Sequence, residues 1–183
     1  MRNIIQNQKS MKKYSIVVFS LFLITLAHGQ KGFAIDLGIG TSKAPMIGVK
    51  YYLDKNAASI GASYQVFNNA LGKNQDLVAG DTAIGDGDYF YSFDIGYTRV
   101  ITEKFSIGAE VSFGTKKYYQ NLRDDSAPSG AYHRILDSKS VVGGGVLLFY
   151  NINEAFSIFG GYNSLREGTF GLEFRFLSEK PQY

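Results

Sequence analysis

Residues 105–113, FSIGAEVSF, alternate between large apolar side chains and small or polar ones. Phe105, Ile107, Val111 and Phe113 share one phase of this alternation, and the other phase holds serine, glycine and a single glutamate. Successive side chains of a strand point to opposite faces of a sheet, so this stretch predicts a β-strand with one apolar face and one small, polar face.

The same period-two pattern recurs along the chain, and no stretch after Gln30 keeps the 3.6-residue period of an amphipathic helix. Its apolar phases run over residues 33–39, 47–53, 60–66, 89–97, 105–113, 142–150, 156–162 and 170–176. In 142–150 both phases are apolar, and we assign Val142, Val146 and Leu148 to the apolar face. The sequence therefore predicts eight strands.

The connections between these strands differ in length. An acidic residue precedes Ser-Ile by a few positions in three segments, 54–62, 103–109 and 154–160, which predicts a repeated tight hairpin. Between the hairpins, 41–45 and 163–168 predict short connections, and 68–88 and 115–139 predict long loops. Tight turns at one end and variable connections at the other are typical of an antiparallel up-and-down meander.

The composition of the two faces predicts which one is outside. Glycine and serine predominate on the non-apolar face, and glycine has no side chain to shield a surface and weakens a strand by roughly 0.5–1 kcal/mol relative to alanine. A narrow lumen accepts small residues and a few charges. We therefore expect an all-β, eight-stranded antiparallel up-and-down transmembrane β-barrel, apolar outside and with a lumen of glycine, serine and charged residues.

Charged residues on the polar phase support this orientation, because a Lys or Arg at the bilayer midplane costs about 2–4 kcal/mol. We expect a paired polar network in the lumen, with net charge −2, made of Asp36, Lys50, Asp94, Glu110, Glu173 and Arg175. Aromatic residues end the outward rows and predict two interfacial girdles. They are Tyr51, Tyr97, Phe105, Tyr150, Phe156 and Phe176 on the short-turn side, and Tyr64, Tyr89, Phe113, Tyr162 and Phe170 on the loop side.

The N-terminus has the pattern of an export signal. Lys12 and Lys13 precede an apolar run, 16–27, which is followed by small residues at the positions that a signal peptidase reads. We expect a signal peptide over 1–29, with Met11 as an alternative start, then the barrel over 30–177 and a short periplasmic tail over 178–183. A membrane anchor is the alternative, but a spanning helix needs about 20 apolar residues.

Composition excludes several kinds of site and partner. The 183 residues include no cysteine, which rules out disulfides, iron–sulfur clusters and zinc sites that use cysteine. The formal net charge is +3, but four basic residues and no acidic ones precede Gln30. The remainder, with 15 basic and 16 acidic groups, is near neutral and predicts no nucleic-acid partner.

With these features the chain resembles the small eight-stranded outer-membrane β-barrels of the OmpA and OmpX type. The resemblance rests on the exported start, the strand pattern over 31–177, the long alternate loops and the last strand, 170–176 (FGLEFRF). It implies contact with outer-membrane lipid and lipopolysaccharide, insertion by the barrel assembly machinery, and periplasmic termini. Members usually end on the aromatic of the last strand, whereas here 178–183 (SEKPQY) follows it.

Few residues suggest chemistry. His133 is the single histidine after residue 30 and lacks a nearby serine, so we interpret it as a solvated loop histidine. Asp81, Asp86 and Asp88 are a weak calcium candidate without the D-x-D-x-D-G spacing. The cations and tyrosines of 115–139 suggest contact with lipopolysaccharide phosphate or a partner. We assign no catalytic residue, cofactor or metal.

The sequence thus predicts a non-enzymatic outer-membrane barrel with a structural or surface-interaction role, an extracellular partner being reached through loops 68–88 and 115–139. Three alternatives stay open: a membrane-embedded enzyme that modifies lipid A, a small porin, and a soluble lipocalin-like periplasmic carrier. The enzyme would need a second catalytic group beside His133.

Overall fold

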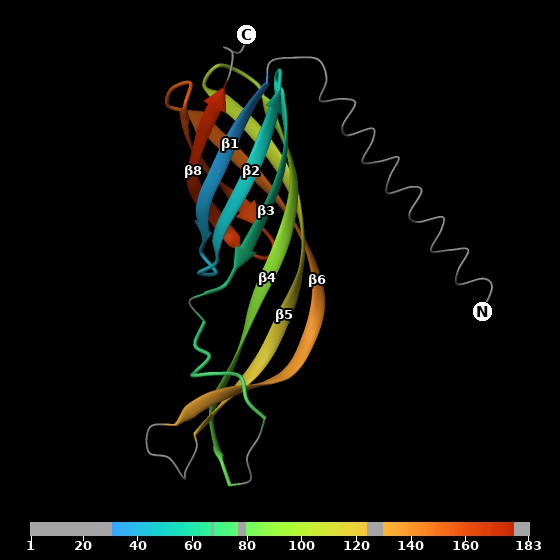
Figure 1. Cartoon of the computed structure of the whole chain (residues 1–183). Helices are drawn as coiled ribbons and strands as arrows, with labels where there is room; N and C mark the ends of the chain where they lie inside the picture. Colours follow the sequence, from blue (N-terminus) through green and yellow to red (C-terminus); the bar gives the residue numbers. More distant parts are fainter. Residues whose placement is uncertain (1–30, 67, 77–79, 124–129, 178–183) are drawn as a thin grey trace, which may run out of the picture.

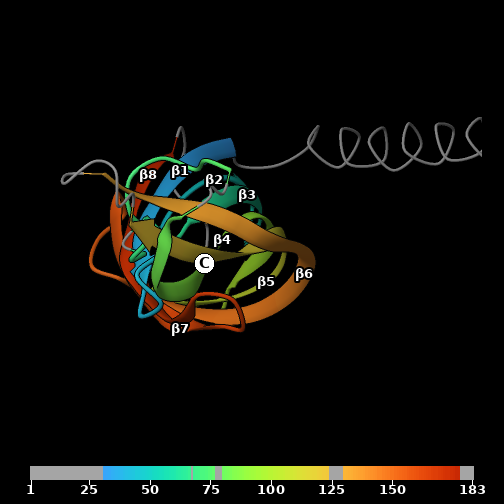
Figure 2. The same ribbon diagram turned by 90° about the horizontal axis from the view of Figure 1, so that it is seen from below.

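The chain forms a closed barrel of eight antiparallel strands (Figure 1). The computed structural model describes residues 31–66, 68–76, 80–123 and 130–177, so the predicted signal peptide and the tail 178–183 lie outside the described residues. Sequential strands pair with one another, and β1 pairs with β8 to close the ring that Figure 2 shows from below. The strands are β1 (Lys31–Gly40), β2 (Pro45–Leu53), β3 (Asn56–Tyr64), β4 (Thr82–Val100), β5 (Phe105–Arg123), β6 (Ala131–Asn151), β7 (Phe156–Asn163) and β8 (Glu167–Leu177).

Burial alternates along the strands and confirms the predicted orientation. On β5, Ile107 is 42% exposed and Val111 45%, whereas Ser106 and Ser112 point into the barrel and are buried. A soluble barrel would bury its large apolar row and expose the polar one. The apolar row is outside here, as a transmembrane barrel requires.

The strand whose sequence is apolar on both phases follows the same rule. Val142, Val146 and Leu148 of β6 are exposed, and Leu147 and Phe149 are buried in the barrel. The register predicted for 142–150 is therefore confirmed.

Aromatic side chains pair at both ends of the outward rows. At the short-turn end, the rings of Phe105 and Tyr150 have centroids 5.4 Å apart. At the opposite end, the rings of Tyr64 and Tyr89 have centroids 6.0 Å apart. Such rows suit the two boundaries of a bilayer.

The tight turns lie at the same end of the barrel as the beginning of β1 and the end of β8. In two of them the same hydrogen bond closes the turn: the amide of Ile101 donates to the Phe105 carbonyl (2.9 Å), and that of Ile152 to the Phe156 carbonyl (3.0 Å). The turn between β2 and β3 is shorter and has Asp54 at a φ of 55°. A tight hairpin is thus found at all three predicted positions, and two of the three share the same closing hydrogen bond.

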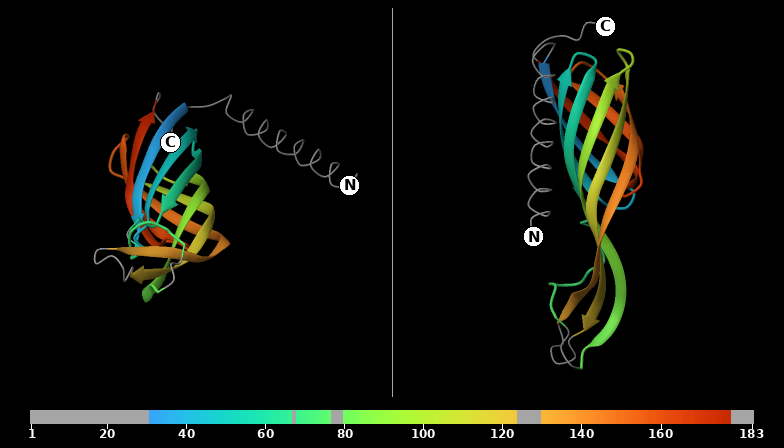
Figure 3. Two further views of the ribbon diagram at one scale, coloured as in Figure 1. Left: turned by 60° about the horizontal axis from the view of Figure 1, so that its bottom comes forward. Right: turned by 90° about the vertical axis from the view of Figure 1, so that its right-hand side faces the viewer.

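The opposite end differs from the prediction. Strands β4 and β5 have 19 residues each and β6 has 21, against 8 to 11 in the other five, so these three run on beyond the barrel (Figures 1 and 3). We call this part, residues 82–89, 115–123 and 131–139, the strand extension. The prediction of loops over 68–88 and 115–139 was wrong wherever these residues are strand.

The strand extension was not predicted because of the surroundings of its two faces. Beyond the bilayer neither face of the extension has to be apolar, so the alternation that revealed the other strands is absent there. An irregularity between Tyr118 and Tyr119 leaves Leu136 of β6 without a cross-strand partner on β5. Such bulges increase the local twist of a sheet. In the described part of the chain, no helix has the length and hydropathy needed to span a bilayer.

Candidate functional site

The barrel interior holds the charged residues that the sequence singled out. Asp36, Lys50, Asp94, Glu173 and Arg175 are buried, and Glu110 is half-buried. They lie in two groups, which we call the turn-side cluster and the loop-side cluster.

The turn-side cluster centres on Glu173 of β8. Lys50 of β2 forms an ion pair with Glu173 and another with Asp36, whose Oδ2 lies 3.2 Å from Nζ. Arg175 Nε donates to Glu173 Oε1 over 2.5 Å, and the Tyr52 hydroxyl donates to the same carboxylate at 3.0–3.1 Å. Glu173 thus accepts from three side chains. A buried charge needs such partners, because removing it from water costs several kcal/mol.

The loop-side cluster contains a cation that the alternating pattern did not predict. Arg166, in the turn between β7 and β8, is fully buried. Its Nη1 lies 2.6 Å from Asp94 Oδ2, and its Nη2 forms an ion pair with Glu110. Asn163 Nδ2 also donates to Glu110 Oε1 over 2.7 Å.

The local sequence directs Arg166 inward. Asn163 Oδ1 accepts the amide hydrogens of Leu165 (2.9 Å) and Arg166 (3.3 Å), an Asx turn that folds the chain over the barrel mouth. On β1, a Cβ at Gly40 would lie 2.4 Å from the Arg166 carbonyl oxygen. Glycine is therefore required at position 40 for the turn to approach this closely.

One signal in the sequence could have revealed Arg166. The predicted network had four carboxylates and only two cations, an excess that burial makes costly. A third cation had to come from outside the alternating segments, and turn residues such as Arg166 were the candidates. With Arg166 the described network has net charge −1.

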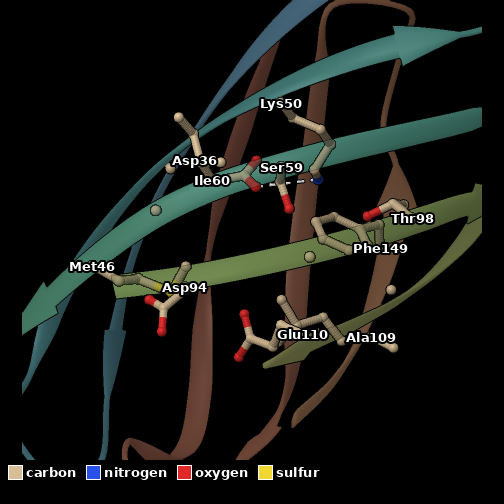
Figure 4. A pocket seen from close by; sticks show the side chains of 15 residues that line it. Asp36, Met46, Lys50, Ser59, Ile60, Asp94, Thr98, Ala109, Glu110 and Phe149 are labelled. Carbon is tan, nitrogen blue, oxygen red and sulfur yellow. Dashed lines mark ion pairs between the residues drawn. The ribbon is translucent and has the colours of Figure 1, made fainter. Parts of the chain in front are cut away.

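Apolar side chains also enter the lumen, contrary to the expectation of small residues and charges alone. Met46, Leu147, Phe149 and Phe159 form a buried cluster, and the Lys50 ammonium lies 3.8 Å from the centroid of the Phe149 ring. Between the clusters is a cavity of about 20 Å³ with Asp36, Asp94 and Glu110 in its wall (Figure 4). This is room for about one water molecule.

His133 is not the solvated loop residue that the sequence suggested. It lies on β6, is 9% exposed, and its Nδ1 is 2.9 Å from the Leu71 carbonyl oxygen. Its ring contacts Tyr119, with centroids 5.8 Å apart. The contacts of His133 therefore attach the connection between β3 and β4 to the strand extension.

The calcium candidates do not form a site within the described residues, where no group of three acidic or histidine side chains could hold a metal. Asp81 accepts a hydrogen bond from the Tyr132 hydroxyl. Asp88 forms an ion pair with Lys116 over 3.0 Å. Asp86 lies opposite Gln120 on the extension.

No protein-family model matches this chain, and neither does any curated protein sequence. Among solved structures it is similar to the attachment invasion locus protein Ail of Yersinia pestis, with 16% identity, a TM-score of 0.44, and coverage of 81% of this chain and 100% of Ail. It is also similar to the N-terminal β-barrel domain of Pseudomonas aeruginosa OprF (14% identity, TM-score 0.41, 81% and 100% covered) and to Neisserial surface protein A (12%, 0.38, 80% and 94%).

These three are small eight-stranded outer-membrane β-barrels. The fold of this chain is defined by its own strand pairing and burial, which make it an eight-stranded antiparallel barrel with an apolar exterior.

Proposed function

We propose that this protein is an integral outer-membrane β-barrel with a closed lumen, and that it acts at the cell surface through its strand extension rather than as a channel or an enzyme. The observation that carries the proposal is the inverted barrel: Ile60, Ile95 and Leu148 are at least half exposed outside, while Lys50 and Glu173 are buried inside. In water such an exterior would expose a large contiguous apolar patch, which favours lipid as its surroundings.

The orientation follows from the two ends of the barrel. Outer-membrane barrels have short periplasmic turns and longer extracellular segments. The three tight turns lie at the same end of the barrel as the beginning of β1 and the end of β8. This arrangement supports periplasmic termini for the mature chain. The strand extension then projects outside the cell.

The closed lumen favours a non-conducting barrel over a small porin. Two groups of ion pairs and an apolar cluster fill the described interior, and the cavity between them holds about one water molecule. An aqueous pore would need a continuous path past these buried side chains.

The environment of His133 favours a surface role over lipid modification. Its Nδ1 is hydrogen-bonded to a main-chain carbonyl and its ring packs on Tyr119, so its contacts are those of a structural residue. A catalytic histidine would instead need a nucleophile or acid within reach.

Lipid and the assembly machinery are the partners that an inserted barrel requires. Lys117 Nζ lies 5.7 Å from the centroid of the Tyr91 ring, and Tyr91 is on the outer face near the loop end. This position supports contact between Lys117 and a lipopolysaccharide phosphate. The outward Phe176 of β8 supports recognition of the last strand during insertion.

Fractionation of cells tests the proposal. The full chain should sediment with outer membranes and should migrate differently on a gel before and after boiling, because a folded barrel resists detergent. Recovery of the protein from the soluble periplasm would overturn the proposal in favour of the carrier.

A further inference from the structure

A second, larger cavity lies at the loop end of the barrel. Its volume is about 330 Å³, which is in the range of small-ligand sites. The turn 41–43, residues Gln65, Asn68 and Asn69 of the connection after β3, the segment 86–88 of β4 and Tyr119 of β5 form its wall. We call it the mouth cleft. It is separate from the lumen cavity, with which it shares no wall residue.

Tyr119 gives the mouth cleft an unusual polar group. The residue is only 2% exposed and its ring packs against Tyr89 and His133. Tyr119 is part of the cleft wall, and within the described residues its hydroxyl has no hydrogen-bond partner. A Cβ at Gly87 would lie 2.5 Å from that oxygen, so any side chain at position 87 would force the hydroxyl to shift. The chain thus positions a phenol hydroxyl at the cleft and gives it no partner of its own.

Other groups in the wall are also unused by the described chain. The side chains of Gln65, Asn69, Asp86 and Lys43 make no hydrogen bond or ion pair there. By contrast, the Ser42 hydroxyl donates to the Arg166 carbonyl over 3.1 Å. The free set therefore combines amides, a hydroxyl, one carboxylate and one ammonium, which together can both donate and accept hydrogen bonds.

We propose that the mouth cleft binds a neutral saccharide. Lys43 and Asp86 carry one positive and one negative charge, which sum to zero, and the carboxylate of Asp88 is paired with Lys116. The wall therefore attracts neither anions nor cations strongly. An apolar ligand would remove these polar groups from water without replacing their hydrogen bonds. The hydroxyls of a sugar donate and accept in turn and match the mixed set. The inference rests on the proposed function, since it supplies the ligand class for the surface role.

Two variants and one control locate the site. Tyr119→Phe removes only the hydroxyl, and the double variant Gln65→Ala with Asn69→Ala removes the two amides. Tyr118→Phe is the matched control, because Tyr118 is the preceding residue, lies beside Lys116 and Lys139, and is not part of the cleft wall. Each variant is first checked for heat-modifiable migration, which reports the folded barrel independently of binding.

Binding is measured by saturation-transfer NMR on the full chain in dodecylphosphocholine micelles, because detergents with sugar headgroups would compete. The probes are lactose, maltose and N,N′-diacetylchitobiose. We expect the wild type and Tyr118→Phe to bind at least one probe with equal Kd. Tyr119→Phe should weaken binding about threefold to tenfold, the value of one hydrogen bond, and the double variant should weaken it further.

A wild type that binds none of the three probes, or cleft variants that bind as well as the control, would overturn the saccharide site. Either result would leave the proposed function intact if the protein still fractionates with outer membranes. A second arm in nanodiscs identifies the source of the sugar. Loss of probe binding when lipopolysaccharide is present assigns the cleft to lipopolysaccharide sugars, and unchanged binding assigns it to a free or foreign saccharide.

Discussion

Asp36 and Glu173 are direct cross-strand partners on β1 and β8, and Lys50 forms ion pairs with both. Two like charges in this position repel each other, and the ammonium that pairs with both carboxylates offsets this repulsion, together with Arg175 on Glu173. The seam that closes the barrel therefore depends on a residue of a third strand, β2.

Lys50→Met should lower the free energy of unfolding by about 3–5 kcal/mol, the cost of leaving buried charges without their partner. Urea unfolding in lipid vesicles measures this. Lys104→Met in an exposed turn is the control and should have little effect. Adding Asp36→Asn to Lys50→Met should restore part of the loss, because it removes the carboxylate that faces Glu173. If the changes in the free energy of unfolding caused by the two substitutions simply add, the shared-ammonium arrangement is contradicted.

Arg166→Ala should open the loop-side half of the lumen. The change removes the side chain that pairs with Asp94 and Glu110 and returns the network to a net charge of −2. The turn-side cluster and the apolar cluster still fill the rest of the lumen, so planar-bilayer recordings should show no more than a small cation-selective leak in the variant. The leak should be smaller still in the wild type and in the Arg99→Ala control, since Arg99 is exposed. A large stable pore in the wild type would mean that the lumen is not closed.

Ile107→Arg should destabilise the folded barrel by about 2–4 kcal/mol if Ile107 faces the hydrocarbon midplane. Ile152→Arg is the matched control: Ile152 is 45% exposed, close to the 42% of Ile107, but lies in a turn. There the cost should be about 0–1 kcal/mol, because the penalty falls near the interface. Equal effects of the two substitutions would argue against a bilayer around β5.

Single cysteines test the orientation directly in this cysteine-free chain. Cysteines at Ile107, Val111, Leu148 and Leu172 should react with a bilayer-restricted label and resist a water-soluble one. Those at Ser106 and Glu173, which point inward, should escape the lipid label. If the first group is shielded from both labels in a protein that is soluble without detergent, the barrel is a carrier.

The mature protein should begin at Gln30, after removal of residues 1–29. N-terminal sequencing of membrane-fraction material measures this. A retained Met11 terminus would instead indicate an uncleaved anchor.

The sequence by itself determined the barrel, because what a transmembrane barrel requires of each strand is a local pattern of residues. A strand between lipid and a polar lumen must alternate at every second residue, and a charge on the wrong face is costly. This requirement assigned Val142, Val146 and Leu148 to the exterior, although their segment is apolar on both phases. It also placed Asp36, Lys50 and Glu173 inside.

Tertiary structure alone decided the features that depend on distant parts of the chain. Arg166 reaches Asp94 and Glu110 only because a turn folds over the barrel mouth, and a turn has no periodicity that reveals its direction. The strand extension has water on its outside, so strand pairing rather than burial defines it, and pairing joins residues far apart in sequence. For the same reason His133 became a buried contact to Leu71, and Tyr119 came to line a cleft with Gln65.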